Sequence, residues 1–407
     1  MLRAALSILG VIYLASTAVQ AQKANRTLIF ANVLFRHGAR APSAQFTNAS
    51  YAEKFPRGLG ELSDQGIENS YKLGRFLGVR YVDSGFLNKK LICKEMYFRS
   101  VKLSRCLMTA AIVGSAMFEG HGKNLHVPVL TEETNENLLN YDMHSCVREK
   151  ELLQEICPTY NSFDEHKSWP LFEDFVYNCL NISNPIFDKY PFKTIEAYIN
   201  QFKNGIALPK VLADNYDTVM KTYTQVGHFI TGTGMYHDPR KMRMKFGNLM
   251  MALMKNVKNR WSCYKNGKNC AHKLRRFVAY STQDWILSGV MESLGVLNST
   301  VTYTKYPEYN SMIIIEMYDN GGKPEIKMFY KKDEVITAEN EMLDVTKLIR
   351  NCPKDQDYCP LEKFVSCCDD YLEYVPGASC LGQNSDVLEE GNSLKRKRRT
   401  KRYAGYE

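Results

Sequence analysis

The chain has 407 residues, of which 44% are hydrophobic and 12% aromatic, a composition typical of a globular protein with a large core. This composition excludes a disordered or fibrous chain. The formal net charge is +9, but seven positive charges lie in the run 395–402, so the rest of the chain is nearly neutral. The charge therefore does not describe an extended basic surface, and we expect no nucleic-acid partner.

The N-terminal segment 1–21 has the pattern of a signal peptide. Arg3 precedes an apolar stretch over Ala4–Ala18, and small residues end the segment at Val19-Gln20-Ala21. No later stretch reaches the roughly 18 apolar residues of a transmembrane helix, so we expect no membrane anchor. The chain also has N-x-S/T glycosylation sequons at Asn25, Asn48, Asn181 and Asn298. Together these features predict a secreted protein. The alternative is a protein that stays in the lumen of the lysosome or of another secretory compartment.

The first strong structural signal is the apolar run Leu28–Phe35, which predicts a buried strand that ends before Gly38 and Pro42. Arg36, His37 and Arg40 follow this strand directly. Arginine binds two phosphate oxygens with its planar fork of donors, and histidine accepts a phosphoryl group on nitrogen. The pattern therefore indicates phosphate chemistry, and the alternative is a basic surface loop in which the histidine is incidental.

The segment after this loop predicts alternating helices and strands. Apolar residues at helical spacing predict a helix over 64–81 with Ser63 as N-cap, followed by a strand over 92–98 and a helix over 104–118. Strand, loop, helix, strand and helix in this order are typical of a parallel sheet wound with helices. In such sheets ligands bind at the carboxyl ends of the strands, which would bring Arg36, His37 and Arg99 together.

The pattern becomes mainly helical over residues 121–270. The clearest amphipathic segments are 174–180, 194–202, 216–230 and 241–258. The last segment is rich in methionine, and we expect these side chains to pack in a core rather than to form a promiscuous binding surface.

Strand patterns return in the last third of the chain. Residues 276–281 predict a strand, and residues 285–294 predict a helix. The segments 311–318 and 325–330 predict a hairpin, because Asn320-Gly321-Gly322 between them is a strong turn signal.

The chain has twelve cysteines, an even number that predicts disulfides in an oxidising compartment. Cys352 with Cys359, and Cys263 with Cys270, are spaced to close short loops. A zinc site is disfavoured, because no histidine stands at ligand spacing and Cys367-Cys368 are adjacent rather than a C-x-x-C pair. We expect no metal and no other cofactor.

Several segments resemble the histidine phosphatases. The resemblance covers Arg36-His37-Gly38-x-Arg40-x-Pro42, then residues 55–66, 97–110 and 278–284, in the expected order. The segment 359–364 is similar to the end of the secreted acid phosphatases of the prostatic and lysosomal kind. This resemblance implies an α/β fold with a phosphoglycerate-mutase-like wound sheet flanked by helices and an inserted, mainly helical cap. The implied domains are 22–120 with 271–385 for the α/β phosphatase domain, 121–270 for the cap, and 386–407 for a basic flexible tail.

The resemblance also implies roles for individual residues. His37 would be the nucleophile and Asp284 the proton donor to the leaving group, while Arg36, Arg40 and Arg99 would bind the phosphate of a phosphomonoester. The same resemblance pairs Cys146 with Cys380 and leaves the partner of Cys179 open. Relatives of this kind form dimers, so we expect a homodimer, although no stretch of the sequence identifies an interface.

Gln283 departs from the family pattern, in which a histidine precedes the acidic residue that is Asp284 here. A glutamine amide donates hydrogen bonds but carries no positive charge. Hydrogen bonds to charged groups contribute roughly 1.5–3 kcal/mol, against about 1 kcal/mol for neutral pairs, so at about 1.4 kcal/mol per decade the loss of the charge costs on the order of tenfold in rate. The sequence therefore predicts a secreted acid phosphatase with weakened turnover. The alternative is a phosphatase fold that binds phosphorylated ligands or a protein partner with little or no turnover.

The basic run 395–402 has three interpretations. Arg399-Thr400-Lys401-Arg402 has the spacing that dibasic secretory proteases recognise, so cleavage after Arg402 is the first. The run would otherwise bind acidic lipids or glycans, or form a solvated terminus without a partner.

Overall fold

The computed structural model describes residues 26–131, 138–139, 146–160, 168–267, 270, 272–335, 342–375 and 377–381. The expected signal segment 1–21 and the basic tail 386–407 lie outside the described residues. Among the helices that the structure describes, none combines the length and the apolar character needed to span a membrane.

A mixed sheet forms the centre of the molecule. Its strands are β1 (Thr27–Arg36), β2 (Met96–Ser100), β3 (Val129–Thr131), β4 (Phe277–Thr282), β5 (Met312–Asn320), β6 (Lys323–Lys331), β7 (Met342–Asp344) and β8 (Cys359–Pro360). The order is β3-β2-β4-β1-β5-β6-β7, and β8 pairs with β6. Strands β3, β2, β4 and β1 run parallel, whereas β5, β6 and β7 add an antiparallel half.

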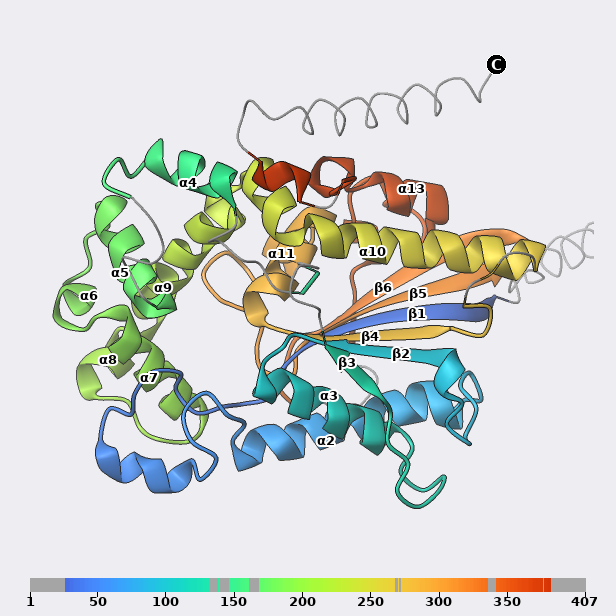
Figure 1. Cartoon of the computed structure of the whole chain (residues 1–407), viewed down its shortest axis with the longest axis horizontal. Helices are drawn as coiled ribbons and strands as arrows, with labels where there is room; N and C mark the ends of the chain where they lie inside the picture. The colour runs from blue at the N-terminus through green and yellow to red at the C-terminus, as the bar shows by residue number, and fades with distance from the viewer. Residues whose placement is uncertain are drawn as a thin grey trace, which may run out of the picture.

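Helices cover both faces of this sheet, which explains why most residues of β1 are apolar on both faces of the strand. Val33 and Phe35 of β1 pack in the core on one face, whereas Leu34 packs in the core on the other. Helices α2 (Asp64–Gly78) and α3 (Ser104–Met117) cover the first face, and α10 (Pro239–Asn266) and α11 (Asp284–Leu294) cover the second (Figure 1). This arrangement confirms the expected wound α/β fold.

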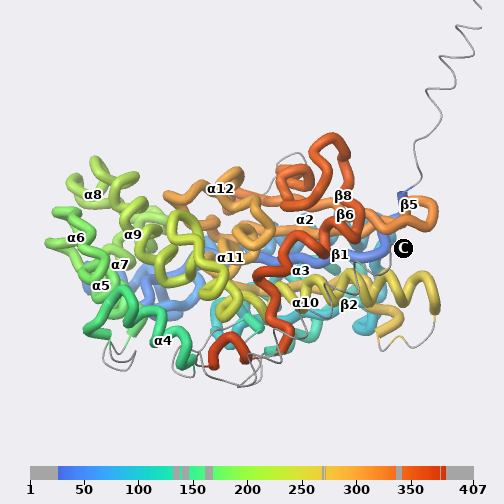
Figure 2. Tube along the Cα trace, turned by 90° about the horizontal axis from the view of Figure 1, so that it is seen from above, coloured from blue at the N-terminus to red at the C-terminus, as the bar shows by residue number. Residues whose placement is uncertain are grey.

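A helical unit lies beyond one end of the sheet in both views (Figures 1 and 2). It contains α4 (Val147–Gln154), α5 (Trp169–Cys179), α6 (Pro185–Lys189), α7 (Phe192–Lys203), α8 (Lys210–Asp214) and α9 (Tyr216–Thr231). The side chains of α5, α6, α7 and α9 form a core of their own, separate from the two sheet cores. We call this unit the helical insert.

Two elements within the predicted insert range 121–270 pack on the sheet. Strand β3 belongs to the sheet, and α10 packs on the sheet rather than in the insert core. The reason for the packing of α10 is its methionine face, because Met242, Met250 and Met254 are buried in the core on the sheet. The methionines therefore serve packing, as expected.

Most predicted elements occur, with shifted ends. Ser63 caps α2 by accepting a hydrogen bond from the Gly66 amide (3.2 Å), but the regular helix ends at Gly78 and continues as one π turn. The strand predicted from residue 92 begins only at Met96, since a short 3₁₀ turn over Cys93–Glu95 precedes it. The β5–β6 hairpin is confirmed, and both glycines of its turn have positive φ. Two short helices, α12 (Leu297–Thr300) and α13 (Leu361–Ser366), complete the fold.

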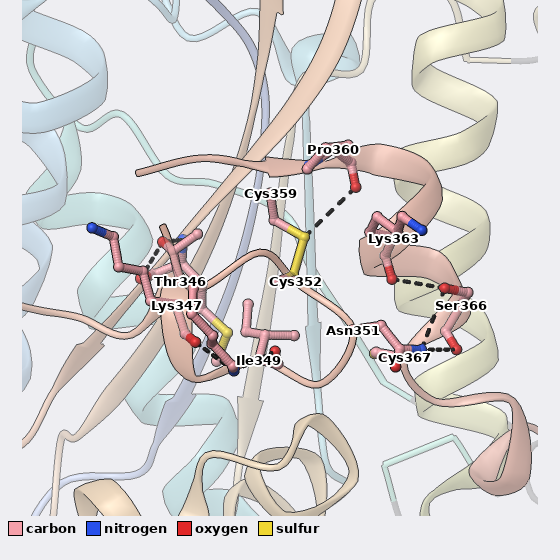
Figure 3. The surroundings of a disulfide bond; sticks show 12 residues. Thr346, Lys347, Ile349, Asn351, Cys352, Cys359, Pro360, Lys363, Ser366 and Cys367 are labelled. Atoms are coloured by element: carbon pink, nitrogen blue, oxygen red, sulfur yellow. Dashed lines mark hydrogen bonds between the residues drawn. A yellow bond between two sulfur atoms is a disulfide. The ribbon is translucent and has the colours of Figure 1, made fainter. Parts of the chain in front are cut away.

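Ten of the twelve cysteines form disulfides. The expected pairs Cys146–Cys380, Cys263–Cys270 and Cys352–Cys359 are confirmed, and Figure 3 shows the last of them beside α13. Cys179, whose partner the sequence left open, forms a disulfide with Cys157. The adjacent Cys367 and Cys368 form a disulfide with each other. Cys93 and Cys106 remain free thiols.

Candidate active site

The predicted site residues meet where β1 and β4 end. The two strands are parallel neighbours with Arg36 opposite Thr282, so the residues that follow them reach the same sheet edge. The His37 amide continues this pairing by donating to the Thr282 carbonyl (3.0 Å). His37 and Arg36 therefore lie beside Gln283 and Asp284, as expected for a ligand site at the carboxyl edge of a parallel sheet.

Close packing of backbone against backbone fixes the loop that carries His37. A Cβ atom added to Gly38 would lie 2.4 Å from the carbonyl oxygen of Gly66, and one added to Gly66 would lie 2.0 Å from the carbonyl oxygen of Ala39. The first turn of α2 thus touches the histidine loop directly. Glycine is required on both sides of this contact because the atoms that a side chain would displace belong to the backbone.

The substitution Gly66→Ala is expected to destabilise the fold by about 2 kcal/mol, because overpacking against the backbone exceeds the roughly 1 kcal/mol gain in helix propensity. Urea unfolding measures this change. The matched control is Gly122→Ala, where the added methyl group meets only the flexible end of Leu125 at 3.1 Å. Equal stability of the two variants would contradict a close contact between α2 and the histidine loop.

Hydrogen bonds fix the tautomer of His37. The ring is 2% exposed, and its Nδ1 lies 2.9 Å from the Gly38 carbonyl oxygen, which only accepts hydrogen bonds. Nδ1 therefore carries the proton. Nε2 holds the lone pair and accepts a hydrogen bond from Arg105 Nε at 3.3 Å. Burial, and then the charges of Arg105, Arg36 and Arg40, hold the pKa of His37 well below its ordinary value of 6.5.

The lowered pKa of His37 predicts a nucleophile that stays neutral in acid. The acidic limb of kcat/KM is expected below pH 6.5, the ordinary value of a histidine. As the pH falls through 6.5, the unfolded chain binds a proton at this residue that the folded chain does not, so folding also loses stability there. A pH–rate profile together with unfolding curves tests both effects. An acidic limb centred at 6.5 would contradict the buried environment of His37.

The arginines of β1 and its loop are held by separate acidic groups. Arg36 forms an ion pair with Asp284 (2.6 Å), donates to the Pro307 carbonyl (2.7 Å) and stacks over the Tyr309 ring at 4.1 Å. Arg40 forms an ion pair with Glu196 of α7 (2.8 Å). The Nε atoms of both arginines are buried and have no hydrogen-bond partner in the structure. The protein itself thus leaves part of this donor set unsatisfied, as in a site built for an anion.

Arg99 is not brought to this cluster, and Arg105 takes the place that we had assigned to it. Arg99 lies inside β2, opposite Tyr280 of β4, and donates to the Tyr97 hydroxyl (3.1 Å). Its position within the strand directs the side chain to a face of the sheet instead of its edge. Arg105, in contrast, lies in the first turn of α3, beyond the strand end, and contacts His37 directly.

The two residues after β4 contribute differently. The Asp284 side chain is 26% exposed and forms the ion pair with Arg36, while its second oxygen accepts a hydrogen bond from the Trp285 amide (2.8 Å). Asp284 is the first residue of α11, and the N-cap position of this helix belongs to Gln283, which makes no side-chain capping hydrogen bond. Gln283 accepts a hydrogen bond from Arg105 Nη2 (3.3 Å), which leaves its amide N–H groups for a ligand. Together, the ion pair and the hydrogen bonds connect Asp284 to Arg36, and His37 to Gln283 through Arg105.

A cavity of about 320 Å³ lies between this cluster and the helical insert. Its lining from the sheet side includes Arg40, Arg105, Gln283 and Asp284. Its lining from the insert includes Trp169, Glu173, Glu196 and Tyr223. Sequence reasoning missed the insert residues because no local pattern shows that distant helices face the sheet edge. Among the described residues, no group of three histidine, cysteine or acidic side chains is arranged to hold a metal ion.

Comparisons with known proteins identify relatives over most of the chain. Putative acid phosphatase 1 of Caenorhabditis elegans is 26% identical over 381 residues, which cover 92% of this chain and 87% of that protein. Prostatic acid phosphatase of Rattus norvegicus is 26% identical over 374 residues, covering 88% and 91%.

Solved structures show the same fold. The phytase of Klebsiella sp. ASR1 matches with a TM-score of 0.56 at 14% identity, over 88% of this chain and 100% of that one. The apo phytase of Hafnia alvei matches with a TM-score of 0.55 at 12% identity, over 89% and 100%. The sequence profile of the histidine phosphatase superfamily (branch 2) matches residues 27–331. The chain therefore belongs to the histidine phosphatase superfamily.

Proposed function

We propose that this protein is an acid phosphatase that hydrolyses phosphomonoesters through a phosphohistidine on His37. The observation that carries the proposal is the fixed tautomer of His37, whose Nε2 lone pair is directed at the arginine cluster instead of at a structural donor of the core. Relatives named acid phosphatases over most of the chain support phosphatase activity.

In the first chemical step, His37 Nε2 attacks the phosphorus atom, and the bond between phosphorus and the ester oxygen breaks. Arg36, Arg40 and Arg105 neutralise the phosphoryl oxygens, over which charge spreads in the transition state. Asp284 takes up a proton from the acidic medium when the phosphate replaces it as the partner of Arg36, and it gives this proton to the departing alcohol oxygen. The products of this step are the free alcohol, the Asp284 carboxylate and phosphohistidine.

In the second step, water attacks the phosphohistidine. Asp284, now a carboxylate beside the cavity, takes a proton from the attacking water, and the bond between phosphorus and His37 Nε2 breaks. Inorganic phosphate leaves, and both side chains return to their starting states. Each proton taken up is returned, so the cycle needs no cofactor.

Gln283 is uncharged, in contrast to the histidine that the family pattern has at this position. Its amide oxygen already binds Arg105, so only uncharged N–H donors face the phosphoryl group. Turnover is therefore on the order of tenfold lower than with a charged donor at this position, because a neutral donor stabilises the transition state less. The alternative, a binding protein with little turnover, also rests on Gln283, but such a protein needs neither the fixed nucleophile nor the acid.

The test is hydrolysis of an aryl phosphate across pH 4 to 7 by the wild type and by Gln283→His. We expect phosphate release by the wild type and roughly tenfold faster release by the variant. Measurable binding of inorganic phosphate with no turnover in either protein would overturn the enzyme and leave the binding protein.

We also propose that the protein is made in the secretory pathway. Disulfides are typical of oxidising compartments, and ten cysteines of this chain form them. Three of the glycosylation sequons, at Asn48, Asn181 and Asn298, lie on exposed residues. Mass spectrometry of the secreted protein, before and after removal of N-glycans, tests this proposal, and unmodified asparagines in all sequons would count against glycosylation.

A further inference from the structure

The cavity beside the phosphate cluster is lined by charged and by aromatic side chains. The charged lining residues are Arg40, Arg105, Glu173, Glu196, Lys245 and Asp284. The aromatic lining residues, which we call the aromatic wall, are Trp169, Tyr223, Trp285 and Tyr306. In the proposed reaction Asp284 protonates the leaving oxygen, so the alcohol part of the substrate lies in this shared space and against this wall.

Glu173 is an unusual member of this lining. It belongs to α5, is 3% exposed, and lines the cavity. The side chain of Trp169 hydrogen-bonds to its carboxyl group. Its Oε2 atom, however, is buried without any hydrogen-bond partner in the structure. A buried polar atom without a partner is costly to folding, so this oxygen is explained best by a partner that arrives with a ligand.

The surroundings of Glu173 keep it uncharged in acid. Burial, and then the carboxylates of Glu196, Asp174 and Asp284, hold the pKa of Glu173 well above its ordinary value of 4.5. The nearby cations do not compensate, because Arg40 pairs with Glu196 and Lys245 pairs with Glu149. A protonated carboxyl group both donates and accepts hydrogen bonds, which suits a hydroxyl group.

We propose that Glu173 is the specificity-determining residue for the leaving group, where its carboxyl group hydrogen-bonds a hydroxyl of an uncharged alcohol. The substrate class is thus phosphomonoesters of neutral alcohols that carry a second hydroxyl group. This inference rests on the proposed phosphatase function. It goes beyond that function because Glu173 contacts neither the phosphoryl group nor the reacting histidine.

The test compares two substrates of similar shape, glycerol 2-phosphate, which has free hydroxyls, and isopropyl phosphate, which has none. We expect Glu173→Leu to raise KM for glycerol 2-phosphate about fivefold, because the variant loses one neutral hydrogen bond to this substrate. The variant is expected to leave kcat and inhibition by inorganic phosphate unchanged. KM for isopropyl phosphate is expected to stay within about twofold, since no hydrogen bond is lost. Glu173→Gln, which retains a donor and an acceptor, is expected to restore the wild-type KM.

The matched control is Asp174→Asn, the adjacent half-buried carboxyl, which accepts a hydrogen bond from the Phe192 amide (2.9 Å) and does not line the cavity. Equal effects of Glu173→Leu on both substrates, or the same selectivity change in Asp174→Asn, would overturn the proposal. If the wild type hydrolyses neither ester, the phosphatase function fails on its own. Calorimetric dissociation constants of the two esters then make the same comparison without turnover.

Discussion

The substitution His37→Ala is expected to reduce phosphomonoester hydrolysis by at least about 10³-fold, because it removes the atom that forms the covalent intermediate. Binding of inorganic phosphate is expected to persist, since the arginines remain. Steady-state kinetics and calorimetry of the same preparation measure the two properties separately. Loss of catalysis with retained phosphate affinity is the pattern specific to a nucleophile.

The control for this variant is His126→Ala, which removes an exposed histidine that bonds only to Ser115 (3.0 Å). It is expected to keep wild-type activity. Circular dichroism and thermal unfolding show whether His37→Ala retains the fold around the buried ring. A folded His37→Ala protein with more than a tenth of wild-type activity would contradict the role of His37.

The substitution Arg105→Ala is expected to lower kcat/KM by about 10²- to 10³-fold, the range for removal of one donor that stabilises transition-state charge. Arg105 contacts both His37 Nε2 and the Gln283 amide oxygen, so its loss also frees these two groups from their common partner. The charge of Arg105 lowers the pKa of His37, so the acidic limb of the pH profile is expected to shift upward in this variant.

Arg99→Ala is the matched control for this prediction, because it also removes an arginine side chain, but one that belongs to β2 and lies outside the cluster around His37. Its guanidinium donates to Tyr97 on the sheet, and we expect kcat/KM to change less than about threefold, within the range of a surface-type substitution. A larger loss for Arg99→Ala than for Arg105→Ala would contradict the arrangement of the site in the structure.

Much of the sheet and its helices could be predicted from the sequence, because their signals are local. The apolar run of β1, the Ser63 cap and the glycine turn of the β5–β6 hairpin each specify an element within a few residues. The loop that carries His37 could also be predicted, since Gly38 and the arginines around His37 are close to it in the chain. These local signals predicted Arg36 and His37 at the carboxyl edge of the sheet, whereas the positions of Gln283 and Asp284 in the site were implied by the resemblance to the histidine phosphatases.

The remaining features depend on contacts between distant segments. The choice between Arg99 and Arg105 depends on where β2 ends, and that strand extends to Ser100, beyond the predicted end at residue 98. The signal that favours Arg105 is its position in the first turn of the helix that follows the strand end. The pairing of Arg40 with Glu196, and the position of Glu173 beside the cavity, depend on how the insert packs and have no local signature.

The central claim is that His37 Nε2 carries the phosphoryl group during turnover. The most direct measurement is rapid quenching in alkali after mixing the protein with a phosphomonoester labelled on phosphorus, followed by peptide mapping. We expect alkali-stable, acid-labile label on the peptide that contains His37, and we expect this label to be absent in His37→Ala and longer-lived in Asp284→Asn. Phosphate release by the wild type without label on this peptide, under conditions that retain phosphohistidine, would contradict this claim.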